Sequence, residues 1–253
     1  FKMGETEYPL ADNIFVSDIY IALGDDVTTI EDNTFKIYTN DSLDYSQTTL
    51  NDPRTIYSIW YNKDEFNQFI SVVDDPVYNL FFRFLYFMGT RLGETTALKW
   101  TDIDFKKNEV TINKTLTTKI KGELFTISTP KTKNSIRVLP LPKSLSMSLF
   151  DRFKEMSKIS NFSKEWFVFG DIYPLRETTI QKKKNKYCDL AGLKRIRIHD
   201  FRHSCASFLI NNGASIVLVS KYLGHSKISM TLDTYTHFYK NQLEDIRNMI
   251  DKL

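Results

Sequence analysis

Apolar residues recur at helical spacing in the chain beyond residue 57. Phe66, Phe69, Ile70 and Val73 stand at i, i+3, i+4 and i+7, and Asp64 precedes them where a cap is favoured. This pattern predicts an amphipathic helix that begins near Asp64.

A second helix is predicted after Asp74-Asp75-Pro76, because proline is favoured in the first turn of a helix. Val77–Met88 is apolar almost all round, which is typical of a buried helix, and it should end at Gly89. A short helix is predicted over Thr95–Trp100. Further helices are predicted at about 143–157, 177–191, 199–211, 214–223 and 239–252.

Between these helices the period of the pattern changes to two. Val110 and Ile112 alternate with polar neighbours, as do Ile136 and Val138, and Pro140 should end the sheet. The pattern predicts an α+β fold that is mostly helical, with a small three-stranded antiparallel sheet. The three strands are predicted over Glu109–Thr118, Glu123–Ser128 and Ser135–Leu139.

The first 55 residues differ from the rest. Ile14–Leu23 and Phe35–Tyr38 could form a helix and a short strand, whose pairing the pattern does not settle. The segment has eleven acidic and three basic residues, a net charge of −8, whereas residues 56–253 have 20 acidic and 31 basic residues, a net charge of +11. The whole-chain value of +3 hides this asymmetry, which fits either a polyanion partner or a solvated lysine-rich surface.

Composition excludes several classes of protein. The chain has 253 residues, 42% of them hydrophobic, but no apolar run of about 18 residues that could span a membrane. The start FKMGETEYPL lacks the apolar core of a signal peptide, and Phe1 indicates a fragment or a processed chain. Cys188 and Cys205 exclude a disulfide scaffold, so we expect packing roles for both and a reducing, cytoplasmic setting.

All four histidines, His199, His203, His225 and His237, lie within 39 residues of one another. They could be ordinary core or surface residues. His199 and His203 could also bind a metal at i, i+4, but Asp200 stands where zinc proteases have Glu, and no third ligand is clearly placed. A third interpretation depends on the cations around them.

Cations and a tyrosine accompany these histidines. His199 and Arg202 share a predicted helical face, and Gly224 is a predicted helix stop before His225. The other candidates are Arg91 in Gly89-Thr90-Arg91-Leu92-Gly93-Glu94, Lys131 in Thr129-Pro130-Lys131-Thr132-Lys133, and Tyr235 in Asp233-Thr234-Tyr235-Thr236-His237.

In order and approximate spacing, these motifs resemble the catalytic domain of tyrosine recombinases of the phage and conjugative-transposon integrase kind. The resemblance runs from about Tyr57 to Leu253. It implies a site-specific recombinase that cleaves and rejoins double-stranded DNA through a 3′-phosphotyrosyl intermediate, to integrate or excise a mobile element. It further implies no cofactor, a homo-oligomer that is tetrameric in the synaptic complex, accessory directionality or DNA-bending proteins, and a bacterial cytoplasmic location.

The chemistry of the residues supports the same interpretation. Cleavage of a phosphodiester without a metal needs several cations around the pentavalent phosphorus. Arg91 and Arg202 offer paired donors for the non-bridging oxygens, and Tyr235 offers a nucleophile. Tyr222 and Tyr239 are rival nucleophiles.

Further roles come from the resemblance alone. It implies that Lys131 protonates the leaving 5′-oxygen, that His199 accepts the tyrosine proton, and that His225 donates a hydrogen bond to the phosphate. Glu94 and Asp200 would orient the arginine and the histidine. Rivals for the lysine role are Lys119, Lys121 and Lys133.

Two basic clusters could be solvated faces or could contact DNA phosphates, and we favour the second interpretation. Alternatives for the whole chain are an Xer-like dimer-resolving recombinase, a type IB topoisomerase relative, a catalytically idle DNA-binding protein of the same fold, and a metal hydrolase. The clustered residues are Lys182, Lys183, Lys184, Lys186, Lys194, Arg195 and Arg197.

Two domains are predicted. Residues 56–253 form the catalytic domain, and the acidic segment 1–55 has an unclear fold and does not resemble the basic core-binding domain usual in the family. That domain is either cut off or replaced by an extension that covers the site or binds a partner. Residues 239–253 carry one apolar face, which packs within the chain or docks on a neighbouring protomer. The face consists of Leu243, Ile246, Met249, Ile250 and Leu253.

Overall fold

The computed structural model divides the chain into two units, Phe1–Ile59 and Trp60–Leu253. In the second unit it describes residues 60–118, 124–129, 135–229, 231–232 and 250, and in the first the backbone of four strands. These strands form one sheet in the order β2-β1-β4-β3, in which only the β1–β4 pair is parallel. β4 overlaps the strand expected over Phe35–Tyr38, and the helix expected over Ile14–Leu23 lies outside the described residues. The strands are β1 (Lys2–Met3), β2 (Thr6–Glu7), β3 (Val27–Glu31) and β4 (Thr34–Ile37).

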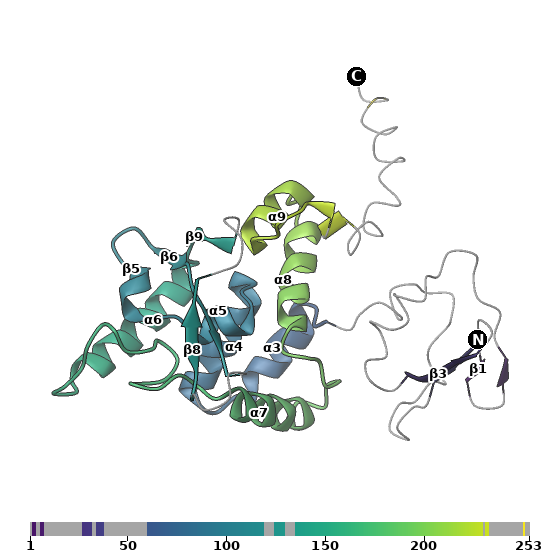
Figure 1. The fold of residues 1–253 in the computed structure, drawn as a ribbon, viewed down its shortest axis with the longest axis horizontal. Coiled ribbons are helices and arrows are strands. Elements are labelled where there is room, and N and C mark those ends of the chain that lie inside the picture. Colours follow the sequence, from purple (N-terminus) through teal and green to yellow (C-terminus); the bar gives the residue numbers. More distant parts are fainter. Residues whose placement is uncertain are drawn as a thin grey trace. The chain divides into compact units, whose positions relative to one another are not determined.

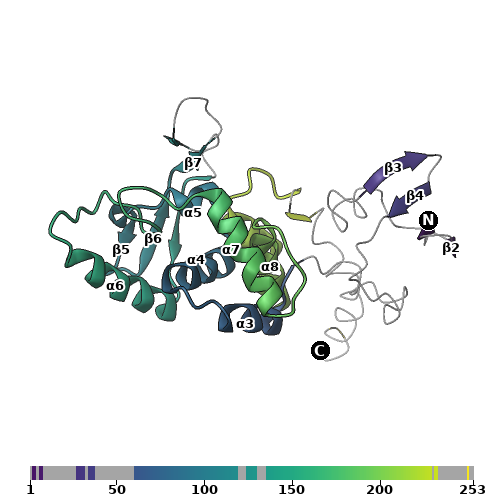
Figure 2. The same cartoon turned by 90° about the horizontal axis from the view of Figure 1, so that it is seen from below.

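The second unit is mostly helical, and its buried helix α4 packs most extensively against α8 (Figures 1 and 2). This confirms the predicted α+β class with small antiparallel sheets. None of the helices described here is long and apolar enough to cross a bilayer. The helices are α3 (Lys63–Ser71), α4 (Pro76–Met88), α5 (Leu92–Thr96), the 3₁₀-helix η3 (Trp100–Asp102), α6 (Lys143–Ser157), α7 (Glu177–Leu190), α8 (Asp200–Asn211) and α9 (Ile216–Leu223).

The starts of α3 and α4 follow from their capping residues. Asn62, rather than the predicted Asp64, caps α3: its Oδ1 accepts from the backbone N–H groups of Asp64 and Glu65, both at 2.9 Å. The Glu65 carboxylate returns a bond to the Asn62 N–H, which completes a capping box. Asp75 caps α4 ahead of Pro76, as the sequence predicts.

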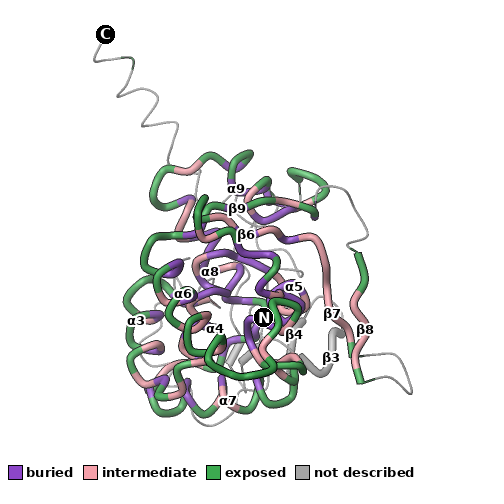
Figure 3. The backbone as a smooth tube through the Cα atoms, turned by 90° about the vertical axis from the view of Figure 1, so that its left-hand side faces the viewer, coloured by how far each residue is buried: buried purple, intermediate pink, exposed green. Residues whose placement is uncertain are grey.

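Aromatic rings join α3, α4 and α8 into one core. Phe66 of α3 stacks on Tyr86 of α4 with 3.7 Å between ring centroids, and Phe82 of α4 stacks on Phe201 of α8 at 5.5 Å. Figure 3 shows buried segments gathered around α4, α8 and β6, with exposed segments on the outer surface. The core therefore holds α4 against both α3 and α8, which matters because the candidate residues lie at the end of α4 and in α8.

The strands differ from the prediction in two respects. The long strand expected over Glu109–Thr118 is two strands, β6 and β7, which belong to different sheets. β6 lies between β5 and β9, whereas β7 pairs with β8 in a separate ribbon that projects beside α5 (Figure 2). The strands are β5 (Ile103–Asp104), β6 (Glu109–Ile112), β7 (Thr115–Thr117), β8 (Thr126–Ser128) and β9 (Arg137–Pro140).

The apolar residues in and just before β9 do not lie on its buried face. Val138 is 55% exposed, as is Ile136 (51%) just before the strand. Leu139 and Arg137 instead pair with the buried Val110 and Ile112 of β6 and share their face. The apolar residues of the alternating pattern are thus buried in β6 and exposed at β9.

Candidate active site

Arg91 lies at the N-terminal end of α5 and is held there by Glu94. Its Nη1 donates to Glu94 Oε1 at 2.8 Å, and its backbone N–H donates to Glu94 Oε2 at 3.0 Å. The Arg91 side chain remains 37% exposed, whereas that of Glu94 is only 3% exposed. Glu94 therefore contacts Arg91, the arginine that the resemblance assigned to it. Part of the Arg91 side chain remains accessible to solvent.

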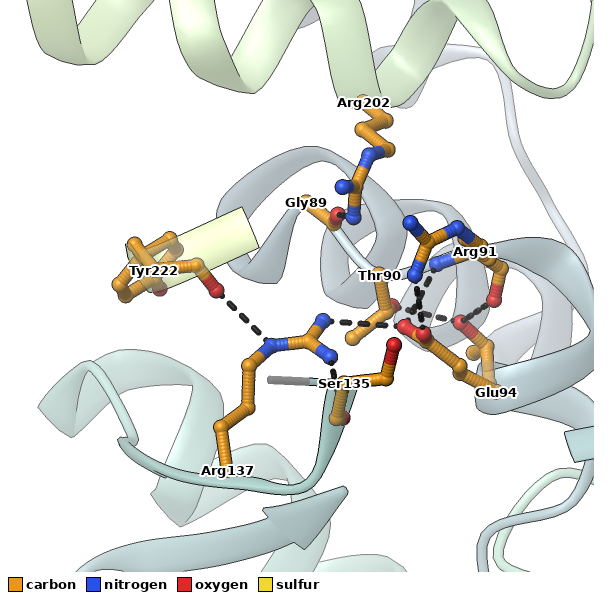
Figure 4. A network of polar contacts seen from close by, with 9 residues as sticks. Gly89, Thr90, Arg91, Glu94, Ser135, Arg137, Arg202 and Tyr222 are labelled. Atoms are coloured by element: carbon orange, nitrogen blue, oxygen red, sulfur yellow. Dashed lines mark hydrogen bonds and ion pairs between the residues drawn. The ribbon is translucent and has the colours of Figure 1, made fainter. Parts of the chain in front are cut away.

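Arg202 points from α8 toward the same place. Its Nη1 donates to the carbonyl oxygen of Gly89 at 2.7 Å, and Figure 4 shows its guanidinium next to that of Arg91. Burial and the Arg91 charge lower the pKa of Arg202 to about 9, so it is still cationic at neutral pH. Its Nη2 is buried and has no hydrogen-bond partner among the residues that the structure describes. A buried, unsatisfied cationic donor beside a second arginine is a strong site for an anion.

Three imidazoles lie in the field of these arginines. Burial and then the Arg202 charge lower the pKa of His225, to about 4, and that of His199. Burial and His199 likewise lower the pKa of His203 to about 4. All three imidazoles are thus largely neutral at pH 7, as an acceptor or a neutral donor requires.

The geometry of each imidazole differs. Although His199 as a residue is exposed, neighbouring side chains shield its ring from water, and the ring lies edge-on to that of His203 with 5.1 Å between centroids. His225 follows the left-handed Gly224 that ends α9, and its Nδ1 lies 2.7 Å from Thr231 Oγ1. No group of three or more His, Cys, Asp or Glu that could hold a metal occurs in the described part of the chain.

The carboxylate of Asp200 binds Arg197, and its expected role in orienting a histidine stays a prediction. Its buried carboxylate accepts from the Arg197 backbone N–H at 2.7 Å and from Arg197 Nη2 at 3.0 Å. This pairing fixes the turn that leads into α8. Arg197 is therefore engaged on one side, although its side chain is 55% exposed.

Among the candidate tyrosines, Tyr222 is excluded as the nucleophile by its contacts. Its hydroxyl donates to the Phe87 carbonyl at 3.0 Å, and burial raises its pKa. Several other expectations lie outside the described residues and stay predictions: Tyr235, its rival Tyr239, Lys131, its rivals Lys119, Lys121 and Lys133, and the apolar face of 239–253.

The sequence profile of the Phage integrase family matches residues 60–242. The chain belongs to this family. Among its curated relatives, the ICEBs1 integrase of Bacillus subtilis is 33% identical over 203 residues, which are 77% of this chain and 54% of the relative. A XerC-like tyrosine recombinase of Caldanaerobacter subterraneus is 34% identical over 61% of this chain and 44% of its own length. The chain thus spans about half the length of these relatives.

Solved structures share the fold of this phage integrase family member. The Tn1549 transposon integrase, in complex with transposon right end DNA, matches with a TM-score of 0.64 and 21% identity over 77% of this chain and 65% of its own. The XerA recombinase matches with a TM-score of 0.58 and 18% identity over 75% and 64%. These matches place the mostly helical fold with small sheets among tyrosine recombinases.

The basic clusters of this integrase family domain are only partly available to a polyanion. Lys184 is 2% exposed and its Nζ donates to the Ile196 carbonyl, so the expected phosphate contact is wrong for this lysine. Its spacing of four residues from both Ile180 and Cys188 places it on the buried face of α7. The helical period could therefore have identified it.

The other clustered cations divide between paired and exposed positions. Lys183 pairs with Asp75 at 2.8 Å, and Lys194 pairs with Glu65 at 3.0 Å. Lys182 and Lys186 are exposed on α7. Arg195 is exposed as well, although Asp189 binds both its Nε and Nη2 at 2.7 Å.

The sequence patterns did not indicate one buried cation of the site. Arg137, in β9, donates from Nη2 to Glu94 Oε2 at 2.9 Å and from Nε to the Tyr222 carbonyl at 2.9 Å (Figure 4). Burial alone would raise the pKa of Glu94, but the hydrogen bond and charge of Arg137, followed by the contacts of Arg91, hold it below its ordinary value. The only sequence signal was its polar position between the apolar Ile136 and Val138.

Proposed function

We propose that the chain is the catalytic part of a site-specific DNA recombinase. It cleaves and rejoins strands through a 3′-phosphotyrosyl intermediate and serves the integration and excision of a mobile element. The observation that carries this proposal is the buried Arg202, whose Nη2 lacks a partner among the described residues and lies in the field of Arg91. A phosphodiester between the two guanidinium groups satisfies both.

Binding of the phosphate comes first. Arg91 and Arg202 each direct N–H donors at a non-bridging oxygen, and these bonds strengthen as negative charge grows on the pentavalent phosphorus. Because Gly89 and Glu94 already hold the two side chains, little reorganisation is needed in the transition state.

Strand cleavage then exchanges one phosphoester for another. The Tyr235 hydroxyl oxygen attacks phosphorus, and its proton passes to His199. The bond from phosphorus to the 5′-oxygen breaks, and Lys131 donates a proton to that oxygen. The products are a 3′-phosphotyrosyl enzyme and a free 5′-hydroxyl. The 5′-hydroxyl of a second strand reverses the step and thereby joins the strands.

The neutral imidazoles suit these roles. A neutral His199 can accept the tyrosine proton at pH 7, which a cationic one cannot. In the tautomer in which the Thr231 hydroxyl donates to Nδ1 of His225, Nε2 carries the proton and can donate it to the phosphate. The contact with Thr231 is compatible with the tautomer that the reaction needs.

A mobile element is favoured over chromosome-dimer resolution. The ICEBs1 integrase covers 77% of this chain, whereas the XerC-like relative covers 61%. The larger share of this chain that matches the ICEBs1 integrase supports an integrase.

The partners follow from the same chemistry. We expect duplex DNA, bound in the bacterial cytoplasm, with Lys182, Lys186, Arg195 and Arg197 near its phosphates. Synapsis would bring four protomers together, aided by accessory directionality or DNA-bending proteins. Residues 239–253 would then dock on a neighbouring protomer.

The test uses a library of nicked duplexes with a randomised core, because the target sequence is unknown. A nick lets the short cleaved strand diffuse away and traps the covalent adduct, which is captured in detergent and sequenced. Wild type should form a 3′-adduct and Tyr235→Phe should not, while Tyr173→Phe, which alters an exposed tyrosine elsewhere, should match wild type.

Two outcomes would contradict the proposal. If wild type forms no adduct with any library member, the proposed cleavage activity is wrong. If Tyr235→Phe still forms the adduct while Tyr239→Phe does not, the nucleophile is wrong although the reaction stands.

A further inference from the structure

Arg137 connects three segments that are distant in the sequence. Its Nη2 binds Glu94 Oε2 of α5 at 2.9 Å, its Nε binds the Tyr222 carbonyl of α9 at 2.9 Å, and its Nη1 binds the Ser135 carbonyl at 3.1 Å (Figure 4). The side chain is only 7% exposed. A buried guanidinium with all three of its nitrogens engaged fixes the relative positions of its acceptors.

The contact with Glu94 bears on the charge of the site. The single carboxylate of Glu94 binds both Arg91 and Arg137. If Arg91 were its only partner, the carboxylate would cancel the charge of Arg91 and compete with a phosphate. Because Arg137 shares the carboxylate, the cluster of Arg91, Arg137 and Arg202 with Glu94 keeps a net charge of +2.

The contact with Tyr222 bears on the position of His225. Tyr222 lies in the last turn of α9, where carbonyl groups lack helical partners, and the N–H groups of Gly224 and His225 bond to Ser220 and Lys221 instead. Arg137 satisfies the Tyr222 carbonyl and places a cation at the negative end of the helix. The turn that carries His225 is thereby tied to the residue that holds Glu94.

We propose that Arg137 is a positioning residue that sets both the charge and the geometry of the phosphate site. It acts through Glu94 on Arg91 and through the end of α9 on His225, without touching DNA. The cleavage experiment for this inference rests on the proposed function. The inference adds to that function a residue that acts on the phosphate site through its neighbours.

The first experiment is a charge-balance cycle on the captured nicked duplex. Arg137→Gln should slow adduct formation about 10- to 100-fold, with duplex affinity changed less than about twofold. Glu94→Gln in the Arg137→Gln background restores the net charge to +2 and should recover about tenfold of the lost rate. Arg137→Lys, which keeps the charge, should stay within about tenfold of wild type.

The matched control is Arg152→Gln. Arg152 is another partly buried arginine that binds two backbone carbonyls, those of Val168 and Gly170, and it does not contact the cluster. Its loss should lower thermal stability and leave the rate of the folded enzyme unchanged. A purely structural Arg137 would behave in the same way, and the Glu94→Gln change would then rescue nothing.

The second experiment does not depend on cleavage. Inorganic phosphate should raise the melting temperature of wild type, Arg91→Gln should abolish that shift, Arg137→Gln should reduce it, and the Glu94→Gln, Arg137→Gln double variant should restore it. The inference is overturned if Arg137→Gln cleaves and binds phosphate as wild type does, or if the double variant recovers neither property. If wild type forms no adduct, the recombinase proposal fails and the phosphate shifts alone decide the role of Arg137.

Discussion

The Nη1 of Arg202 and the carbonyl oxygen of Gly89 form a buried hydrogen bond of 2.7 Å. Gly89 ends α4 in the left-handed conformation, with φ at 57°, and Arg202 lies in the first turn of α8. A Cβ added at Gly89 would lie 2.5 Å from Leu223 Cδ2 and 3.0 Å from Cys205 Sγ. One residue without a side chain thus lets α4, α8 and α9 meet where Arg202 is held.

Gly89→Ala should therefore destabilise the fold strongly. The new Cβ adds a clash with Leu223 to the cost of the left-handed backbone, which together amount to about 2 to 5 kcal/mol. Denaturant unfolding measures the change. Gly192→Ala is the matched control, since Gly192 has φ at 63° but no neighbour within 4 Å of an added Cβ, and it should cost only about 1 to 2 kcal/mol. Equal losses in the two variants would contradict the packing argument.

Arg202→Lys should separate catalysis from folding. A lysine ammonium can still donate to the Gly89 carbonyl, but it lacks the second nitrogen that Arg202 presents to a phosphate. Adduct formation on the nicked duplex should fall about 10²- to 10³-fold. The free energy of unfolding should change much less, and Arg152→Lys should leave the rate of adduct formation unaltered. A rate near that of wild type would show that Arg202 does not bind the phosphate.

Local patterns predicted the longer described helices well because each carries its own signals. The short helix expected over Thr95–Trp100 was wrong, since α5 ends at Thr96 and η3 begins at Trp100. α4 begins after the capping residue Asp75, at Pro76, and ends at the left-handed Gly89. The apolar run between them is typical of a buried helix. The cap of α3 was misplaced because Asn62 and Asp64 are both good capping residues, and only the Glu65 side chain decides between them.

Tertiary contacts explain the misses. Ile136 and Val138 alternate with polar residues, but Arg137 is the residue that faces inward, because its guanidinium binds the buried Glu94 carboxylate and the Tyr222 carbonyl. Both partners are distant in the sequence, at 43 and 85 residues from Arg137. Motif order could identify Arg91, His199, Arg202 and His225 as candidates, whereas no pattern indicates what holds them.

The effect of substituting a lysine of α7 should depend on whether that lysine is buried. Lys184→Ala should cost about 2 to 3 kcal/mol of stability, since it empties a buried volume and leaves the Ile196 carbonyl unpaired, while the salt dependence of duplex binding stays unchanged. Lys182→Ala and Lys186→Ala should each leave stability within about 0.5 kcal/mol and reduce the slope of log Kd against log salt by about 1. Fluorescence anisotropy at several salt concentrations measures the slope. A reduced slope in Lys184→Ala would contradict this assignment.

Acid should unfold the protein partly through its neutral imidazoles. His203 and His225 have pKa values of about 4 in the folded state, because burial and neighbouring cations disfavour their charged forms. An unfolded chain protonates histidine near pH 6.5. Between these two limits the unfolded state binds more protons than the folded state, so stability rises with pH through this window and is lost as the pH falls.

His225→Gln should flatten this dependence between pH 4 and 6.5. Each shifted imidazole contributes a slope of up to about 1.4 kcal/mol per pH unit, and the variant removes one of them while keeping a polar side chain of similar size. Urea unfolding at half-unit pH steps gives the slope for both proteins, and His203→Gln should lower it in the same direction. Carboxylates contribute to the slope of every variant and cancel in the difference. Equal slopes in wild type and His225→Gln would mean that His225 titrates normally in the folded protein and is not held neutral beside Arg91 and Arg202.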